Sequence, residues 1–444
     1  MTRRLSTLAA IACAGMSLAA APEDTTPEHR LAARVEAFVD NHETDGLSVV
    51  ITVGTDTLFE TAAGYADPAG RALAEPDSVY RAGSLTPFLV SVLLIELHEE
   101  GKLDLDDPVS EHLEGFAVEG VTLTHLLSHS SGLPGYAAGM QVHKTPESAV
   151  VMSWLADQAL LFTPGSCQAF SETDELLAGL VLEAVAGASV RERIETHLFP
   201  AFDLTDTQYD WDGPALQEQE PSSREFPGGA VELSPGVAPF AALGLCTTAQ
   251  DLARLQHGLA GGRLIDVSIF EELARPRRLS DGSPAGFGLG VSHRSLADRP
   301  QISYGGGASG SQAHVSYFPE TEMTIALMAR GADLPLASLA DELGRVVLDV
   351  ASPSLEDLPL EEDEVERYCG QYVAGCIHLT IEHDGEHLVL RPSIGSRRTL
   401  WRQSELVFAA ADDPGVRVTF ALADGAVTGL VLDEHGTRVE ARRQ

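Results

Sequence analysis

The spacing of apolar residues divides the chain into a mixed helix-and-strand part and a strand-only tail. Apolar positions recur at helical spacing over 27–40, and two short strands are predicted at 47–53 and 56–65 around a turn at Gly54-Thr55. Residues 88–97 are apolar on nearly every face, as in a helix buried on all sides, and Gly101 is a natural stop for it. We therefore expect helices packed against a sheet.

Three further elements are predicted before residue 351. A helix follows the break at Pro164-Gly165 and ends at Gly187. Its apolar stripe comprises Leu176, Leu177, Leu180, Val181, Ala184 and Val185. A strand-rich stretch over 286–329 and a last helix over 334–350 complete this part.

The pattern changes after residue 351. An acidic, proline-containing linker is expected over 352–364. Past it the period becomes two, because Ile377, Leu379 and Ile381 alternate with polar residues. Asp384-Gly385 and Asp424-Gly425 lie between such runs as hairpin turns. Residues 365–444 are therefore predicted to form a small antiparallel β domain.

The first residues have the composition of an export signal. Arg3 and Arg4 precede an apolar stretch over 5–18, and three alanines follow at 19–21. This order predicts a secretory signal peptide over 1–21 and a periplasmic or extracellular protein. A lipoprotein acylated at Cys13 is the alternative. No other apolar run approaches the roughly 20 residues that span a bilayer, so we expect no integral membrane segment after cleavage.

Charge and cysteine content narrow the function classes. Asp and Glu number 66 against 29 Lys and Arg, and so negative a surface repels phosphate backbones, which argues against nucleic-acid binding.

Four cysteines remain beyond Cys13, and an even count in an exported chain favours disulfides. Cys369 and Cys376 flank a short segment that could fold back, so this pair is favoured, with Cys167 and Cys246 as the remainder. Some could instead be small buried hydrophobes.

Several segments together resemble the serine β-lactamase and penicillin-binding-protein superfamily, closest to class C β-lactamases and their esterase and D-aminopeptidase relatives. The matching segments are 64–67, 80–84, 100–109, 123–134, 164–165, 203–207, 247–253 and 287–290. The resemblance implies an α+β fold over 22–351, with an antiparallel sheet flanked by helices and an all-helical lobe. The tail resembles the small β-barrel domain appended to some of these hydrolases.

The resemblance also implies a nucleophilic serine in a Ser-x-x-Lys motif. Ser84 matches the serine, but Pro87 stands where the lysine is expected. A serine hydroxyl is a poor nucleophile unless a neighbouring base takes its proton. The chain has only two lysines, Lys102 and Lys144, and neither has this spacing.

Two other family elements are also altered. Phe170-Ser171-Glu172 matches a Tyr-x-Asn loop, so phenylalanine replaces the tyrosine base and Glu172 brings a negative charge where an amide is expected. Tyr304-Gly305-Gly306 matches a Lys-Thr-Gly or His-x-Gly strand, so the basic side chain is absent. The glycines up to Gly307 that allow close backbone approach remain. Phe170 and these glycines are candidate substrate contacts.

Each candidate also has a structural interpretation. Ser84 could accept the Thr86 amide as the N-cap of the buried helix, worth about 1 kcal/mol, and Pro87 suits a first helical turn. Glu172 could be a solvated acid at a helix start, and Tyr304 the aromatic wall of a pocket. If either approaches Ser84, it could instead serve as the base.

The histidines do not predict a metal site. His125 and His129 are four residues apart but lack the glutamate of the zinc-protease pattern, and the resemblance implies a structural role for them. His378, His383 and His387 lie around a hairpin that is predicted to be solvated. We expect neither a metal nor a cofactor.

These observations favour an exported serine-hydrolase homologue that is catalytically impaired, or a pseudoenzyme, whose cleft still binds a small molecule, a peptide or a cell-wall fragment. The alternative is an active serine esterase, amidase or D-amino-acid peptidase with Ser84 as nucleophile and Glu172 or Tyr304 as its base. A third interpretation is an envelope-associated interaction module, which nothing in the sequence positively supports.

Overall fold

The computed structural model describes residues 26–42, 44–66, 72–140, 147–209, 245–273, 275, 277–283, 285–308, 310–331, 334–393 and 397–444. The predicted signal peptide, with Cys13, lies outside these residues. Within the described part of the chain, no helix is both long enough and apolar enough to cross a membrane.

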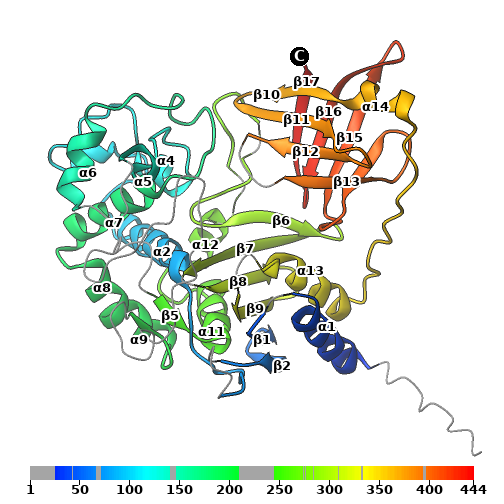
Figure 1. The fold of residues 1–444 in the computed structure, drawn as a ribbon. Helices are drawn as coiled ribbons and strands as arrows, with labels where there is room; N and C mark the ends of the chain where they lie inside the picture. The colour runs from blue at the N-terminus through cyan, green and yellow to red at the C-terminus, as the bar shows by residue number, and fades with distance from the viewer. Residues whose placement is uncertain are drawn as a thin grey trace, which may run out of the picture.

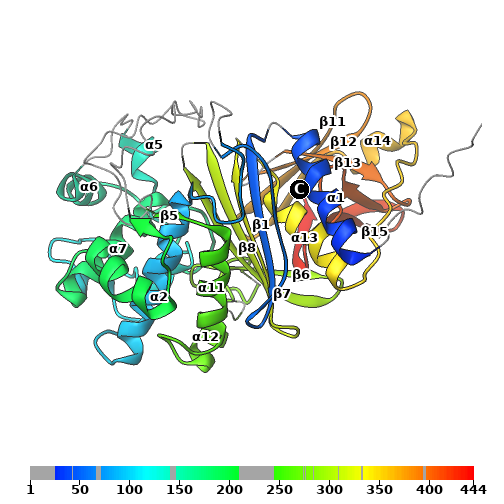
Figure 2. The ribbon, with the colours of Figure 1, turned by 90° about the horizontal axis from the view of Figure 1, so that it is seen from below.

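A six-stranded antiparallel sheet forms the centre of the molecule (Figures 1 and 2). Its strand order is β2-β1-β9-β8-β7-β6. The strands are β1 (Gly46–Val53), β2 (Asp56–Gly64), β6 (Ser292–Leu296), β7 (Arg299–Ala308), β8 (Ser311–Phe318) and β9 (Met323–Arg330). All of β9 and all but the last residue of β1 are buried, because helices cover both faces of the sheet.

Helices α1 (Pro27–Asn41) and α13 (Leu336–Val347) cover one face (Figure 2). Helix α1 begins after Thr26, whose hydroxyl oxygen accepts a hydrogen bond from the His29 amide at 3.3 Å. It buries Leu31, Val35 and Phe38, so the predicted amphipathic opening helix is confirmed.

Helix α2 (Thr86–Glu99) lies between the other face and the helical lobe (Figures 1 and 2). Every residue from Phe88 to Leu97 is buried, and Gly101 follows at φ +70°, as the apolar run predicted. The remaining helical segments are α3 (Val109–His112), α4 (Leu123–Leu127), α5 (Tyr136–Met140), α6 (Ser148–Leu155), α7 (Glu172–Ala186), α8 (Val190–Arg193), the π-helix η2 (Ile194–Leu198), α9 (Phe199–Phe202), α11 (Ala249–Ala260) and α12 (Val267–Leu273). A small three-stranded sheet joins β3 (Tyr80–Arg81), β5 (Leu245–Thr247) and β4 (Gln208–Tyr209).

Helix α7 ends at Gly187 with φ +66°, as predicted, but it is buried differently from its predicted stripe. Ala184 is exposed, whereas every residue from Thr173 to Gly179 is buried. The first two turns are enclosed because α2 and α4 both pack against α7. Acidic residues in these turns are therefore removed from solvent.

The tail forms a closed barrel of eight strands, since β10 pairs with β17 as well as with β11 (Figure 1). Its strands are β10 (Gly370–Ala374), β11 (Ile377–His383), β12 (Leu388–Pro392), β13 (Arg398–Arg402), β14 (Val407–Ala410), β15 (Val416–Ala423), β16 (Ala426–Glu434) and β17 (Thr437–Arg443). Asp424 and Gly425 have φ +52° and +81°, which confirms a tight hairpin turn. Helix α14 (Glu362–Tyr368) begins inside the segment predicted as a linker.

The barrel packs beside β6 and α13 through a buried polar cluster. The Asp341 carboxylate accepts hydrogen bonds from Arg294 Nη2 at 2.7 Å and Gln301 Nε2 at 3.0 Å. His435, from the β16–β17 turn of the barrel, lies 3.3 Å from Asp341 and 3.0 Å from Asp413 through its two ring nitrogens. Each charged group of the cluster therefore has a partner of opposite charge.

Candidate active site

Ser84 lies in a short 3-10 turn, η1 (Gly83–Leu85), directly before α2. The N-cap of α2 is Leu85, and no side chain caps the helix. The prediction that Ser84 caps α2 is therefore wrong, because the 3-10 turn displaces the serine from the cap position. Its hydroxyl instead donates a hydrogen bond of 3.5 Å to the Gly307 carbonyl. Pro87 occupies the first turn of α2, as predicted.

Strand β7 lies so close to the Ser84 turn that Gly306 has no room for a side chain. A Cβ atom added to Gly306 would lie 2.5 Å from the Ser84 carbonyl carbon and 2.7 Å from the Ala82 carbonyl oxygen. Real side chains do not accept such distances. The predicted close backbone approach at the glycines is thus confirmed for Gly306, and it holds β7 beside the serine.

Tyr304 lies on β7 with its ring stacked on Phe88 of α2, at 3.9 Å between ring centroids. Only 5% of its surface is exposed, and its hydroxyl has no hydrogen-bond partner among the described residues. Burial raises the pKa of this phenol. Tyr304 therefore forms a pocket wall and does not hydrogen-bond to Ser84.

Glu172 is the first residue of α7 and half-buried. Its carboxylate lies against Gly135, where an added Cβ would be 2.7 Å from Oε2. It is not among the described residues that line the cavity beside Ser84. The structure thus brings Tyr304 to this cavity and leaves Glu172 outside its lining.

The cavity beside Ser84, here called the cleft, has a volume of about 440 Å³. Its walls come from η1 and the start of α2, the end of α4 and the loop after it, α7 and the segment before it, residues 287–292, and β7. The aromatic and proline side chains that line it are Pro87, Phe88, Phe170, Phe287 and Tyr304, and the polar ones are Ser84, Ser91, His129, Gln168, Asp174, Glu175 and Ser292. Gly305 of the predicted set also lines it, and Phe170 remains 65% exposed.

His129 is held in the wall of the cleft by Asp174. Its Nδ1 lies 3.2 Å from Asp174 Oδ2, and Ser131 donates a hydrogen bond of 2.5 Å to Oδ1. Burial raises the pKa of Asp174, and the bonds from His129 and Ser131 offset part of that rise. The His129 ring also packs at 5.1 Å from Phe170 and 5.3 Å from Phe287. By contrast, His125 serves a capping box with Thr122 at the start of α4.

Glu175 is one of several lining residues that the sequence interpretation missed, and it is the most buried acid among them after Asp174. Only 9% of its surface is exposed, and burial raises its pKa to about 8, with the negative charges of Glu172 and Asp174 adding to the rise. It lies three and seven residues before Ala178 and Leu182, which are both buried. A charged residue at a buried helical position was the available signal.

The comparisons with known proteins agree with this geometry. A family model described as Beta-lactamase matches residues 31–348. The chain belongs to the beta-lactamase family. A penicillin-binding protein of Bacillus subtilis (strain 168) is 24% identical over 92% of this chain and 97% of its own length. The D-aminopeptidase of Gluconobacter oxydans (strain 621H) is 23% identical over 67% of this chain and 58% of its own.

Solved structures show the same fold as this beta-lactamase-family chain. The octameric penicillin-binding protein homologue from Pyrococcus abyssi superposes with a TM-score of 0.64 at 19% identity, over 93% of this chain and 99% of that one. A class C beta lactamase from Rhodobacter sphaeroides gives 0.59 at 19% identity, over 72% and 99%. The predicted superfamily and the predicted α+β fold with a small β domain are confirmed.

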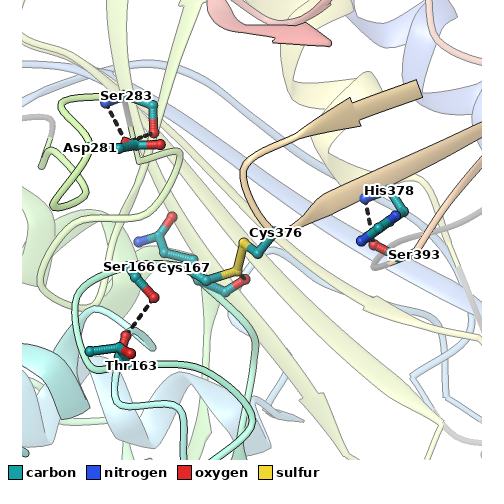
Figure 3. Close-up of a disulfide and its surroundings, with 9 residues drawn as sticks. Thr163, Ser166, Cys167, Asp281, Ser283, Cys376, His378 and Ser393 are labelled. Atoms are coloured by element: carbon teal, nitrogen blue, oxygen red, sulfur yellow. Dashed lines mark hydrogen bonds between the residues drawn. A yellow bond between two sulfur atoms is a disulfide. The ribbon is translucent and has the colours of Figure 1, made fainter. Parts of the chain in front are cut away.

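In this family member a disulfide links the rim of the cleft to the barrel. Cys167, next to the lining residue Gln168, is bonded to Cys376 at the tip of the β10–β11 hairpin (Figure 3). The predicted pairs are therefore wrong, because neither Cys369 nor Cys246 takes part in a disulfide among the described residues. Cys369 and Cys376 are held apart by β10, which is extended between them, and Cys246 is buried within β5.

Gln168 fixes the segment beside this disulfide. Its Nε2 donates to the carbonyls of Ser128 at 2.9 Å and Phe287 at 2.8 Å. The segment that carries Phe170 is thus tied to two other walls of the cleft as well as to the barrel. Such support keeps a binding site preformed.

Proposed function

We propose that this protein is an exported member of the beta-lactamase family that keeps a ligand-binding cleft but acylates Ser84 slowly or not at all. One observation carries the proposal: among the described residues, the hydrogen-bond partner of the Ser84 hydroxyl is the Gly307 carbonyl. A carbonyl oxygen does not take a proton at neutral pH. Loss of a general base costs about 10²–10⁴-fold in rate.

The other proton acceptors of the cleft do not replace the missing lysine. The Tyr304 hydroxyl bonds to none of the described residues, and its raised pKa makes the basic phenolate scarce. His129 is bonded through Nδ1 to Asp174, and no hydrogen bond joins it to Ser84 among the described residues. Glu175 holds a proton at neutral pH, because its pKa is about 8, and a protonated carboxyl is no base.

Export is supported by two independent features. The N-terminal residues carry two arginines, an apolar stretch and a run of alanines in the order of a signal peptide. The Cys167–Cys376 disulfide is of a kind that persists in oxidising compartments.

Labelling with a fluorescent fluorophosphonate and a fluorescent penicillin tests the impaired acylation. We expect no stoichiometric adduct at pH 7, with wild type and Ser84→Ala giving the same background. An adduct that requires Ser84 would overturn the proposal and favour the active esterase, amidase or peptidase. Its base would then be found by repeating the labelling at pH 9 with Glu175→Gln, Glu172→Gln and Tyr304→Phe.

Rebuilding the family motifs provides a positive test of the same idea. The triple variant Pro87→Lys, Phe170→Tyr and Glu172→Asn restores the three proton-transfer and orienting groups that the family resemblance implies. We expect Ser84-dependent labelling to appear in this variant. A folded triple variant that stays unlabelled would mean that the shape of the cleft, not the missing base, prevents acylation.

A further inference from the structure

The cleft is lined by two carboxyl groups and by no described lysine or arginine. The carboxyl groups belong to Asp174 and Glu175. A ligand with a carboxylate, as every penicillin has, would face these two carboxyl groups without a lysine or an arginine to pair with. The lining is complementary to a positive group.

The two carboxyl groups differ in what they bond to. Asp174 is bonded to His129 and accepts the Ser131 hydroxyl, so its oxygens are satisfied within the protein. Glu175 is more than nine-tenths buried, lines the cleft, and accepts no hydrogen bond from any described residue. The charges that act on it, those of Glu172 and Asp174, are negative and raise its pKa further. A buried carboxyl in this state lacks a partner that a ligand could supply.

A second buried group in the cleft also lacks a partner. The Tyr304 hydroxyl is buried, has no hydrogen-bond partner in the described part of the chain, and belongs to the same lining. Phe170 and Phe287 add aromatic surface, and aromatic faces attract cations. A complementary ligand would therefore have a cation to pair with Glu175, a polar group to hydrogen-bond to the Tyr304 hydroxyl, and an apolar part to pack against the aromatic rings.

We propose that the cleft binds a molecule that carries a primary ammonium group on an apolar body, with the ammonium bonded to Glu175 and the apolar part against Phe170, Phe287 and Tyr304. The N-terminus of a peptide with an apolar first residue belongs to this class. The inference rests on the proposed function in using the same cleft, but it does not require that Ser84 be unreactive.

A matched set of three small probes tests the charge preference. Phenethylamine, 2-phenylethanol and phenylacetate share the phenyl ring and differ in bearing a positive, a neutral or a negative group. Calorimetric titration of the full chain at pH 8 should show phenethylamine binding at least about 30-fold more tightly than either other probe. Equal affinity for all three, or a preference for phenylacetate, would overturn the proposal, as would no saturable binding of any.

Replacing the Glu175 carboxyl tests whether this residue causes the preference for the amine. Glu175→Gln keeps the size of the side chain and should bring the affinity for phenethylamine down to that for 2-phenylethanol, which should not change. Glu119→Gln removes the same charge from an exposed position and should leave both affinities as in wild type. Unchanged amine binding in Glu175→Gln would contradict the assignment. Circular dichroism and the melting temperature establish that each variant is folded.

The test of amine binding and the test of Ser84 acylation can fail independently of each other. Amine preference in a protein whose Ser84 is labelled by fluorophosphonate would retain the ammonium site and reject the impaired acylation. An unlabelled Ser84 without amine preference would reject the ammonium site alone.

Discussion

Two buried carboxyl groups in this protein have opposite electrostatic environments. Burial raises the pKa of both, but at Asp341 the bond from His435 and the charge of Arg294 outweigh it and hold the pKa at about 2. At Glu175 no described cation does so, and the pKa is about 8. The first carboxyl is one part of a closed network between the barrel and α13. The second faces a cavity.

The difference separates structural charge from charge that is available to a ligand. A buried ion pair is costly to break, because removal of one partner leaves the other charge uncompensated. A buried acid without a partner instead lowers the stability of the fold wherever it must ionise. Neutralising Asp341 and neutralising Glu175 should therefore change stability in opposite directions.

The largest change in stability is expected in the polar cluster around Asp341. Asp341→Asn leaves His435 and Arg294 without their shared carboxylate and should lower the free energy of unfolding by about 3–5 kcal/mol. Urea denaturation at pH 7 measures it. Asp349→Asn removes an exposed acid near the end of α13 and should cost no more than about 0.5 kcal/mol. A loss at Asp341 as small as that of the control would mean that the network contributes little.

Neutralising Glu175 in the cleft is expected to raise the free energy of unfolding. The pKa of Glu175 is about 8 in the folded state, whereas its ordinary value is 4.5. Between these two pH values the unfolded chain loses the proton and the folded chain keeps it, so the free energy of unfolding of wild type falls as the pH rises from about 4.5 to about 8. Glu175→Gln cannot ionise, so its stability relative to wild type should rise by about 4 kcal/mol between pH 5 and pH 9. Denaturation curves at both pH values measure this. A difference that does not depend on pH would contradict the raised pKa.

The disulfide joins the two regions and should have the next largest effect. Cys167→Ser opens a covalent loop of 209 residues and should cost about 2–4 kcal/mol. Cys369→Ser removes a free thiol and serves as the control. Thermal unfolding of both variants, with and without dithiothreitol, provides the measurement. Dithiothreitol should shift wild type and Cys369→Ser but not Cys167→Ser; equal shifts in all three would show that this bond is not formed.

Local patterns predicted most of the fold. The opening helix, the fully apolar run of α2 and the end of α7 at Gly187 followed from periodicity and from single glycines, because such signals depend only on neighbouring residues. The Cys167–Cys376 bond could not be found in this way. It depends on where the barrel packs against the rim of the cleft, and the packing of segments 209 residues apart cannot be inferred from neighbouring residues in the sequence.

The site was predicted only in part. Ser84, Phe170, Tyr304 and Gly305 do meet in the cleft, because the family resemblance carried their positions. Glu175 was missed because acids in a first helical turn are usually solvated and favoured there by the helix dipole. Its burial depends on α2 and α4, which enclose the first turns of α7.

The pKa of Glu175 is the most direct measurement of the contrast between the two carboxyl groups. Carbon-13 NMR of protein labelled at the glutamate carboxyl carbons can follow it, with the resonance assigned by its loss in Glu175→Gln. We predict a value of about 8 in the free protein and a fall of about two units or more when phenethylamine is bound. A value near 4.5 that phenethylamine does not change would contradict both the unpartnered carboxyl and the ammonium site.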